Sequence, residues 1–327
     1  MSLSGSRDLN LALGTLEFVQ ALVNGLLQGG FFALSAAGFS LIFGVQKVLN
    51  VAHGAFIILA AFATIQFSIL VTPALHIDPL FSIFPDFLML ALLGGSVYLL
   101  IIYRIERTGF EAPLLATFGL SILLEYLASN GIGPFPALDP SHGIGAQAQH
   151  QSYSSNAFQI GPIFLQEAQA LAFVMAVVVL PILQLFLSRT YRGRAIRATS
   201  QDWEAAEFSG INTKAVRLLS FITGSALAGL AGGLFAFTNS VTATAGDEVL
   251  LPVILVVVIL GGVGSILGTL AAGFLVGVTM SVSSLIALTL PSQFQFHADL
   301  APLLTFLIFI VILMVRPRGL FGHSAAE

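Results

Sequence analysis

Residues 218–238 read LLSFITGSALAGLAGGLFAFT, an uncharged run of apolar and small residues. A helix needs about 20 mostly apolar residues to cross the hydrocarbon core of a bilayer, and this run has that length. Within it, Gly229 and Gly233 are spaced i, i+4, which lets the backbones of two membrane helices approach closely. The stretch therefore predicts a membrane-spanning helix that packs tightly against its neighbours.

Apolar runs recur along the whole chain, all uncharged except Pro113–Ser129, which contains Glu125. Those that meet or approach the length of a span are Phe18–Val45, Ala55–Thr72, Phe87–Tyr103, Pro113–Ser129, Ala170–Leu187, Val249–Val263, Ile266–Leu290 and Leu300–Val315. We predict an all-α integral membrane protein, a bundle of about nine transmembrane helices, or eight if Val249–Val263 is re-entrant. Some helices should be short or broken, because that run ends in the glycines of LGGVGS and Pro181 falls inside another.

The composition indicates a protein that is solvated by lipid. Charged residues make up 9% of the 327 residues and apolar residues 57%, whereas an ordinary soluble domain is about 25% charged. This excludes a soluble globular enzyme, because so few charges cannot cover its surface. The chain has no cysteine, which excludes disulfides, zinc–thiolate sites and iron–sulfur clusters.

The basic residues divide the loops into two sets. All Lys and Arg except Arg7 fall into one set, which includes the loop 189–214. The other set carries Asp and Glu but no Lys or Arg, and it includes 73–86, 130–169, 239–248 and 291–299. Because Lys and Arg stay on the cytoplasmic side, we predict the N-terminus outside and the C-terminus in the cytoplasm. Segment 130–169 is then an extracytoplasmic surface loop of a single transmembrane domain, 1–327.

The chain lacks the motifs of an ATPase or of a common membrane protease. Neither lysine lies in a G-x-x-x-x-G-K-[ST] sequence, and no His pair forms H-E-x-x-H. A chain of many spans without a catalytic constellation is most simply a translocation path, driven by an ion gradient or by a separate ATPase. Glu125 is the one clear ionisable candidate inside a predicted span. It either reaches water near the outer end of its span or lines the path.

The basic loop 189–214 contains the sequence DWEAAEF at 202–208. Gly210 fits the position just after a helix, so we predict a short helix that ends there. Its apolar face at helical spacing should comprise Ala195, Ile196, Ala198, Ala205, Ala206 and Phe208. Such a segment could dock into a partner's groove, or lie on anionic lipid through its arginines and Trp203. The residues alone leave both interpretations open.

Two parts of this loop resemble those of known transporters. Glu204–Gly210, EAAEFSG, is similar to the EAA-x-x-x-G loop of ABC importer permeases, which in that family is the coupling helix that seats in the ATPase subunit. The I-x-L-P continuation of maltose-type permeases is absent. Gly193–Ala198, GRAIRA, and Gly210–Asn212, GIN, instead resemble the branched-chain amino acid-type permeases. The resemblance implies that Arg194, Arg197, Glu204, Ala205, Ala206 and Gly210 take part in ATPase coupling.

Other segments resemble the shorter of the two permease types of this family, in the same order along the chain. They are NGLLQGGFFALSAAGFSLIFGVQKVLNVAHG at 24–54, PLLATFGLSIL at 113–123, LGGVGSILG at 260–268 and VRPRGLFG at 315–322. The sequence departs from the family at Leu267, where Pro is more usual, and at Ala55, where many members carry Glu. The similarity runs from about residue 20 to 322.

Two groups of matched residues are candidates for the translocation path or its gate, beside Glu125. Asn50 and His53 lie where the basic loop enters the second span, and Asn50 is placed to cap that helix. They form either a polar helix start or part of an inner gate. Gly261, Gly262 and Gly264 allow a tight turn. That turn either joins two spans or breaks a helix that points at the solute.

The resemblance implies a permease subunit of an ATP-driven ABC importer in the bacterial inner membrane, not an enzyme. It would hold no cofactor itself, since ATP and Mg would be bound by ATP-binding cassette subunits. Further expected partners are a second permease subunit, identical or related, an extracytoplasmic solute-binding protein and membrane lipid, with no nucleic acid. The solute would be a branched-chain or other amino acid, an amide, urea or a small organic acid. The alternative is an ion-coupled secondary carrier or channel that acts without an ATPase.

Overall fold

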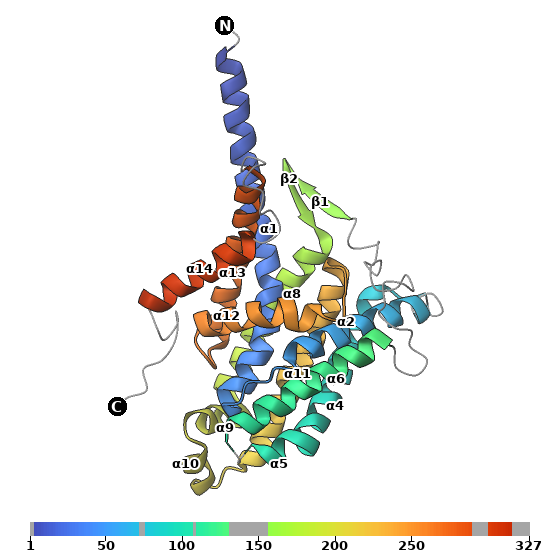
Figure 1. Ribbon diagram of the computed structural model, residues 1–327, viewed down its shortest axis with the longest axis vertical. Coiled ribbons are helices and arrows are strands. Elements are labelled where there is room, and N and C mark those ends of the chain that lie inside the picture. Colours follow the sequence, from blue (N-terminus) through green and yellow to red (C-terminus); the bar gives the residue numbers. More distant parts are fainter. Residues whose placement is uncertain (1–2, 72–75, 107–108, 131–155, 290–299, 316–327) are drawn as a thin grey trace.

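The computed structural model describes residues 3–71, 76–106, 109–130, 156–289 and 300–315, and almost all of them are helical (Figure 1). The first half contains α1 (Leu3–Gln46), α2 (His53–Leu70), the 3₁₀ turn η1 (Pro79–Ser82), α4 (Ile83–Val97), the π-helical η2 (Tyr98–Ile102), α5 (Tyr103–Ile105) and α6 (Glu111–Asn130). The second half contains β1 (Ala157–Ile160), β2 (Ile163–Gln166), α8 (Glu167–Arg189), α9 (Tyr191–Gln201), α10 (Trp203–Phe208), α11 (Thr213–Thr238), the π-helical η4 (Gly246–Leu250), α12 (Leu251–Gly261), α13 (Ile266–Thr289) and α14 (Leu300–Val315).

Six helices in the described part are long and apolar enough to cross a membrane: Gly14–Gln46, Pro79–Ile105, Glu111–Ser129, Glu167–Arg189, Thr213–Thr238 and Ile266–Ala287. His53–Ile69 and Pro302–Met314 are apolar but shorter. Each run predicted from hydropathy coincides with a helix, so the prediction of an all-α membrane protein is confirmed. The count of eight or nine spans and the placement of the termini stay predictions.

Helices α1 and α11 form the centre of the bundle. In their most apolar windows, 83% and 78% of residues are buried, against 28% in the windows of Pro79–Ile105, α6 and α8. The two central helices touch where Gly38 meets the backbone of Gly224. Helix α13 packs on α1 in the same way, since a Cβ on Gly25 would lie 2.5 Å from the Val278 Cα. The spaced glycines therefore serve close helix packing, as the sequence predicts.

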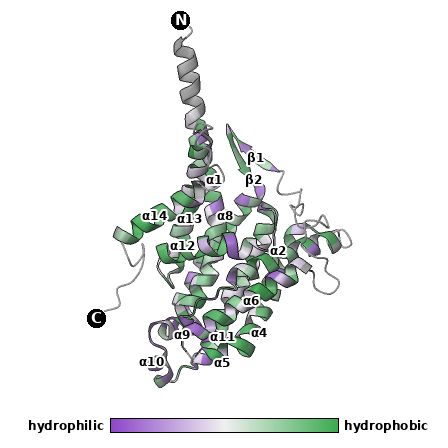
Figure 2. Cartoon of the chain, viewed as in Figure 1, coloured by the Kyte–Doolittle hydropathy of each residue, from purple (hydrophilic) through white to green (hydrophobic). Residues whose placement is uncertain are grey.

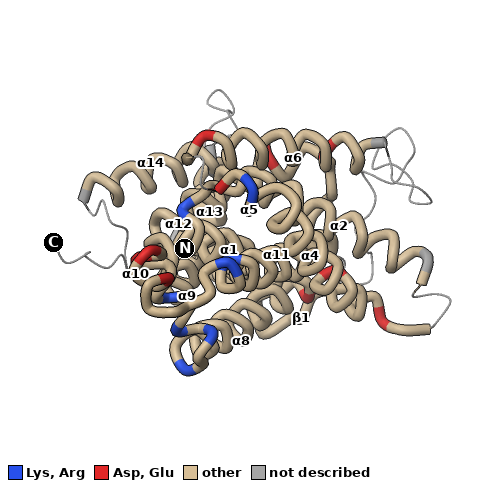
Figure 3. The backbone as a smooth tube through the Cα atoms, turned by 90° about the horizontal axis from the view of Figure 1, so that it is seen from below, with Lys and Arg blue, Asp and Glu red and all other residues tan. Residues whose placement is uncertain are grey.

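The two ends of the bundle differ in polarity. Hydrophilic residues concentrate around α5, α9 and α10 at one end (Figure 2), and Lys and Arg gather there in the view of Figure 3. We call this end the basic end. Between it and the opposite end, the helices are mostly hydrophobic. The separation of charge that the loops predict is thus present in the fold.

The opposite end carries a β-hairpin, where the sequence analysis predicts only a surface loop. Strands β1 and β2 pair antiparallel, with Phe158 opposite Leu165, and Gly161 supplies the left-handed backbone of the turn (φ 63°). The side-chain amide of Gln20 on α1 holds this hairpin: its Nε2 donates to the Phe164 carbonyl oxygen (2.7 Å), and its Oε1 accepts from the Phe164 N–H (2.9 Å). Residues 131–155 of the predicted loop lie outside the described part.

Candidate functional site

The predicted coupling loop folds into two short helices at the basic end. Thr190 caps α9 by accepting a hydrogen bond from the Gly193 N–H (3.0 Å). Gly193 is buried against the backbone of Phe186 and Leu187, where a side chain would not fit. This contact folds α9 sharply back on the end of α8. Arg194 and Arg197 of α9 are exposed.

Helix α10 is built by local capping at both ends. Asp202 accepts from the N–H groups of Glu204 (2.9 Å) and Ala205 (3.0 Å). At its end, Ile211 N–H donates to the Ala206 carbonyl (3.1 Å) and Gly210 N–H to the Glu207 carbonyl (3.0 Å). This pair of bonds is a Schellman motif, with Gly210 in the left-handed region (φ 82°). The helix end predicted at Gly210 is confirmed.

The apolar face predicted for this loop is only partly correct. Ala195, Ile196 and Ala206 are buried, but Ala205 is exposed and Phe208 is 91% exposed. The reason is that α9 and α10 are separate helices joined at Asp202, so residues on the two do not share one face. Glu204, Ala205, Phe208 and Gly210 thus present both charge and apolar surface outward, as a docking segment requires.

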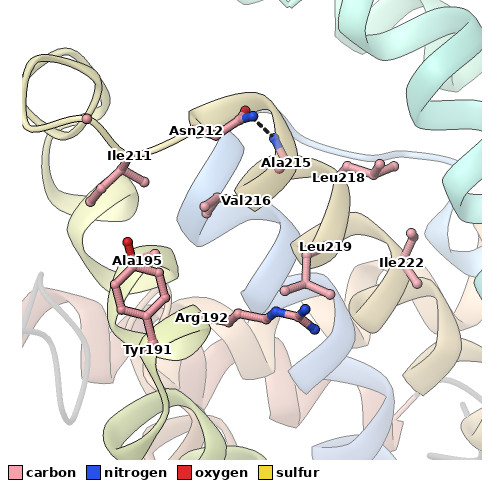
Figure 4. A pocket seen from close by; sticks show the side chains of 11 residues that line it. Tyr191, Arg192, Ala195, Ile211, Asn212, Ala215, Val216, Leu218, Leu219 and Ile222 are labelled. Atoms are coloured by element: carbon pink, nitrogen blue, oxygen red, sulfur yellow. Dashed lines mark hydrogen bonds between the residues drawn. The ribbon is translucent and has the colours of Figure 1, made fainter.

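A cavity of about 480 Å³ opens beside this loop, between α9, the Gly210 turn and α11 (Figure 4). Its lining is largely apolar and consists of Tyr191, Arg192, Ala195, Gly210, Ile211, Asn212, Ala215, Val216, Leu218, Leu219 and Ile222. Asn212 caps α11 by accepting from the Ala215 N–H (3.0 Å) and so fixes one rim. An apolar hollow next to an exposed charged helix suits the binding of a protein partner.

A buried ion pair, which the sequence analysis does not predict, lies behind the loop. Arg217 of α11 contacts Glu106, just after α5, at 3.0 Å, with side chains 10% and 4% exposed. The Tyr98 hydroxyl donates to the same carboxylate (3.3 Å). Trp203 of α10 faces the Arg217 guanidinium at 5.2 Å from ring centroid to Cζ. The four residues connect α10 to α11 and α5, and we call them the ion-pair cluster. The one signal in the sequence is a lone Arg at the start of an apolar run.

The start of α2 lies inside the bundle, not at its basic end. His53 is fully buried, and its Nε2 lies 3.0 Å from the carbonyl oxygen of Ser35, about three turns before the end of α1. Asn50 does not cap α2, so that prediction is wrong. Ala52 is the N-cap without a side-chain bond, and both amide atoms of Asn50 are buried without a partner. The chain reaches this cap along a non-helical stretch that turns back from the end of α1.

Helix α6 and η4 close around this start. The Thr117 hydroxyl accepts from the Val51 N–H (3.2 Å), and the carbonyl oxygens of Leu114 (3.0 Å) and Leu49 (3.3 Å) both lie within reach of its one hydrogen. One turn further along α6, Ser121 donates to the carboxylate of Asp247 (2.6 and 2.8 Å). We call Asn50, His53, Thr117, Ser121 and Asp247 the central junction.

A backbone contact between the start of α2 and η4 corrects the predicted loop assignment. Gly54 and Gly246 touch backbone to backbone, so neither residue tolerates a side chain. The sequence analysis places residues 239–248 in an outer loop and the start of the second span at the opposite side. Both segments instead enter the bundle and meet in its interior. Together η4 and α12 form a continuous helical run, Gly246–Gly261, which is shorter than the about 20 residues that a bilayer requires.

The remaining candidates take separate places. Gly262 (φ 90°) and Gly264 (φ 79°) form a tight turn between α12 and α13, and Gly261 packs against Gly268. The Gly264 N–H donates to the Ser40 hydroxyl of α1 (3.0 Å). Glu125 is half-buried one turn beyond Ser121 on α6, on the face that leads to the central junction. The structure joins Asn50 and His53 in one site and leaves the glycine turn apart.

Besides Glu106, Asp86 is a buried acid that was not predicted from the sequence. Asp86 falls in a predicted outer loop, but it occupies the first turn of α4 and is 2% exposed. Thr64 of α2 donates a hydrogen bond to its carboxyl group. Gly233 lies beside this pair. The signal for it is weak, because Asp86 borders an apolar run instead of interrupting one.

Comparison with known proteins finds similarity over most of the chain. The family model described as branched-chain amino acid transport system, permease component, matches residues 21–315. The high-affinity branched-chain amino acid permease protein BraD of Pseudomonas aeruginosa is 27% identical, over 95% of this chain and 98% of its own. The corresponding LivH of Escherichia coli is 26% identical with the same coverage. The fructose import permease protein FrcC of Rhizobium meliloti is 30% identical over 51% of this chain and 46% of its own. No solved structure matches significantly.

Proposed function

This chain belongs to the branched-chain amino acid transport permease family, and we propose that it is the membrane subunit of an ATP-driven ABC importer. Its solute would be a branched-chain or other amino acid, an amide, urea or a small organic acid. The ATP and Mg would be held by separate ATP-binding cassette subunits. A second permease subunit and an extracytoplasmic binding protein would complete the assembly in the bacterial inner membrane.

The observation that supports coupling to an ATPase is the geometry of α10. It is a short, doubly capped helix that exposes Glu204, Ala205 and Phe208 at the basic end, beside an apolar cavity. Trp203 at its start contacts Arg217, and Arg217 contacts Glu106. A push on α10 by a partner would therefore reach α11 and the end of the α4–α5 segment through direct contacts. Movement of these helices would switch the bundle between its outward and inward openings.

A test of coupling uses two glycines that share the same backbone strain. Gly210 and Gly161 both have left-handed backbone and open space around a would-be Cβ, but they lie at opposite ends of the molecule. We expect Gly210→Trp to insert normally yet to lose ATP-driven uptake, because the indole obstructs docking of α10. Gly161→Trp, with similar strain of about 1–2 kcal/mol, should retain ATPase-coupled uptake. ATP hydrolysis and uptake are measured together in proteoliposomes that contain the whole complex.

Affinity purification in a gentle detergent separates this proposal from an ion-coupled carrier or channel. Copurification of P-loop ATPases and a related permease is the expected result, identified by mass spectrometry. If the chain is recovered alone while a control importer stays intact, and if Gly210→Trp transports normally, the carrier or channel becomes the better account.

A further inference from the structure

We propose that the central junction lies on the solute path and that Asp247, with Glu248 beside it, receives the ammonium group of the solute. The proposal rests on the transport function above and narrows its substrate class to solutes with a cationic group, such as zwitterionic amino acids. It concerns a site in the middle of the bundle, apart from the coupling loop.

Positions along two helices, α6 and α1, each indicate how deep the central junction lies in the membrane. Ser121, which bonds to Asp247, lies midway along α6, which runs from Glu111 to Asn130. Ser35, opposite His53, lies about 16 Å from the end of α1 at the usual rise per residue. The hydrocarbon core of a bilayer is about 30 Å thick. Asp247 is therefore close to the middle of the membrane.

The acids at this depth have no positive partner. Asp247 accepts hydrogen bonds from Ser121, and in the described part of the chain no Lys, Arg or His pairs with it or with Glu248. Asp247 is half-buried and Glu248 is exposed on the surface of η4. Carboxylates at mid-membrane are not tolerated against lipid and face water-filled cavities or partners instead. We therefore expect the exposed Glu248 on η4 to face water or a polar partner instead of lipid.

Buried polar groups without partners lie in the same junction. Both amide atoms of Asn50 and the Nδ1 of His53 are buried and make no hydrogen bond. Asn50 is 1% exposed and His53 is 0% exposed, so bulk solvent does not reach them. Such groups are costly unless another molecule satisfies them in some state. The Asn50 amide, buried without a partner beside the start of α2, supplies a donor for the carboxylate end of a zwitterion.

The backbone at the junction is irregular on both sides. Residues 47–52 are non-helical, and η4 is a π-helical turn. Irregular backbone at membrane depth occurs where it is buried in protein or lines a cavity, and π turns are frequent at functional sites. In this conformation, the contact of Gly54 with Gly246 closes the space between α2 and η4. Solute passage at this point requires the two segments to separate.

The test uses cysteine labelling, for which the chain is suited because it has no cysteine of its own. Glu248→Cys is compared with Ile122→Cys in the assembled complex. Ile122 follows Ser121 directly and is 51% exposed, so it lies at the same depth but on another face of α6. The probes are a cationic and an anionic methanethiosulfonate reagent, which react with a thiol only in contact with water.

We expect the cationic reagent to label Glu248→Cys about 10-fold faster than the anionic one, because the field of Asp247 concentrates cations. Asp247→Asn in the same background should abolish this preference. Ile122→Cys should stay unlabelled. L-leucine should slow the labelling of Glu248→Cys, whereas 4-methylpentanoate, its analogue without the ammonium group, should not.

Two results would overturn the inference. One is that Glu248→Cys is as unreactive as Ile122→Cys, and the other is that labelling ignores the charge at residue 247. Either result can occur in a complex whose uptake is ATP-driven, in which case the proposed function stands. If uptake does not depend on an ATPase, the proposed function fails, but the labelling pattern still decides whether the junction lies on the path.

Discussion

The ion-pair cluster and the central junction both place carboxylates inside an apolar bundle. In the described part of the chain, the carboxylate of the cluster contacts a cation and that of the junction does not. Glu106 is paired with Arg217 and also accepts from Tyr98, and Trp203 faces the guanidinium. Asp247 has the hydroxyl of Ser121 and no cation within the described residues. A carboxylate whose charge is neutralised within the chain helps to hold the helices together. A charge left without a counter-ion is available to a ligand that arrives from outside.

The largest expected effect comes from removing the cation of the ion-pair cluster. Arg217→Met leaves the Glu106 carboxylate buried and unpaired, which should cost about 3–5 kcal/mol of stability. We expect strongly reduced yield and a lower Tm of the detergent-solubilised complex. Glu106→Gln added to Arg217→Met should restore part of the loss, because the uncompensated charge is removed. Lys214→Met is the matched control on the same helix, because Lys214 is exposed and its contact with the Tyr103 ring (3.9 Å from Nζ to the centroid) should contribute only about 0.5–1 kcal/mol.

At Asp247 in the central junction we expect the opposite pattern, with little change in stability and a clear change in transport. Asp247→Asn keeps the shape of the side chain and can keep a hydrogen bond to Ser121, so the Tm should hardly change. Loss of the charge should weaken transport of a zwitterionic solute by about 2 kcal/mol or more, seen as a raised KM for uptake. Asp247→Glu should recover part of it. A marked fall in Tm with unchanged KM would instead make Asp247 a structural residue like Glu106.

A smaller effect is expected at the residue that orients this acid. Ser121→Ala removes the hydroxyl that bonds to Asp247 and should raise the KM by about 10-fold, which corresponds to the lower end of the about 1.5–3 kcal/mol that a hydrogen bond to a charged group contributes. Ser96→Ala on α4 is the control, because Ser96 bonds only to the carbonyl of Leu92 in its own helix. Equal effects of the two changes would show that Ser121 has no special part in transport.

The smallest effect is expected at Glu125. It is half-buried one turn beyond Ser121 and faces the junction without reaching it. Glu125→Gln should change uptake less than Asp247→Asn, through the weaker field of a charge at greater distance. Unchanged solute affinity and uptake would remove Glu125 from the path while leaving the junction intact.

The parts of the fold that depend on local sequence were predictable. Hydropathy locates each long apolar helix because the bilayer requires a minimum length of apolar residues, and Gly210 marks a helix end because the left-handed cap favours glycine. The failures involve contacts between distant segments. Nothing near Asp247 in the sequence shows that its segment turns inward to Ser121, and nothing near Arg217 shows that Glu106 completes its pair. Asn50 has the right side chain for a cap, but tertiary packing gives that position to Ala52.

Hydrogen bonds join helix α1 to other segments at several heights, and three of them reach the hairpin, α2 and the glycine turn. Gln20 holds Phe164 of the hairpin, the Ser35 carbonyl meets His53, and Ser40 receives the N–H of Gly264. A helix moves as a nearly stiff rod, so a shift of α1 along its axis would displace all three attachments by the same amount. A shift of α1 would then be felt at the hairpin, at His53 and at the glycine turn simultaneously. Because the single helix α1 connects these sites, they can move together without a series of intermediate steps.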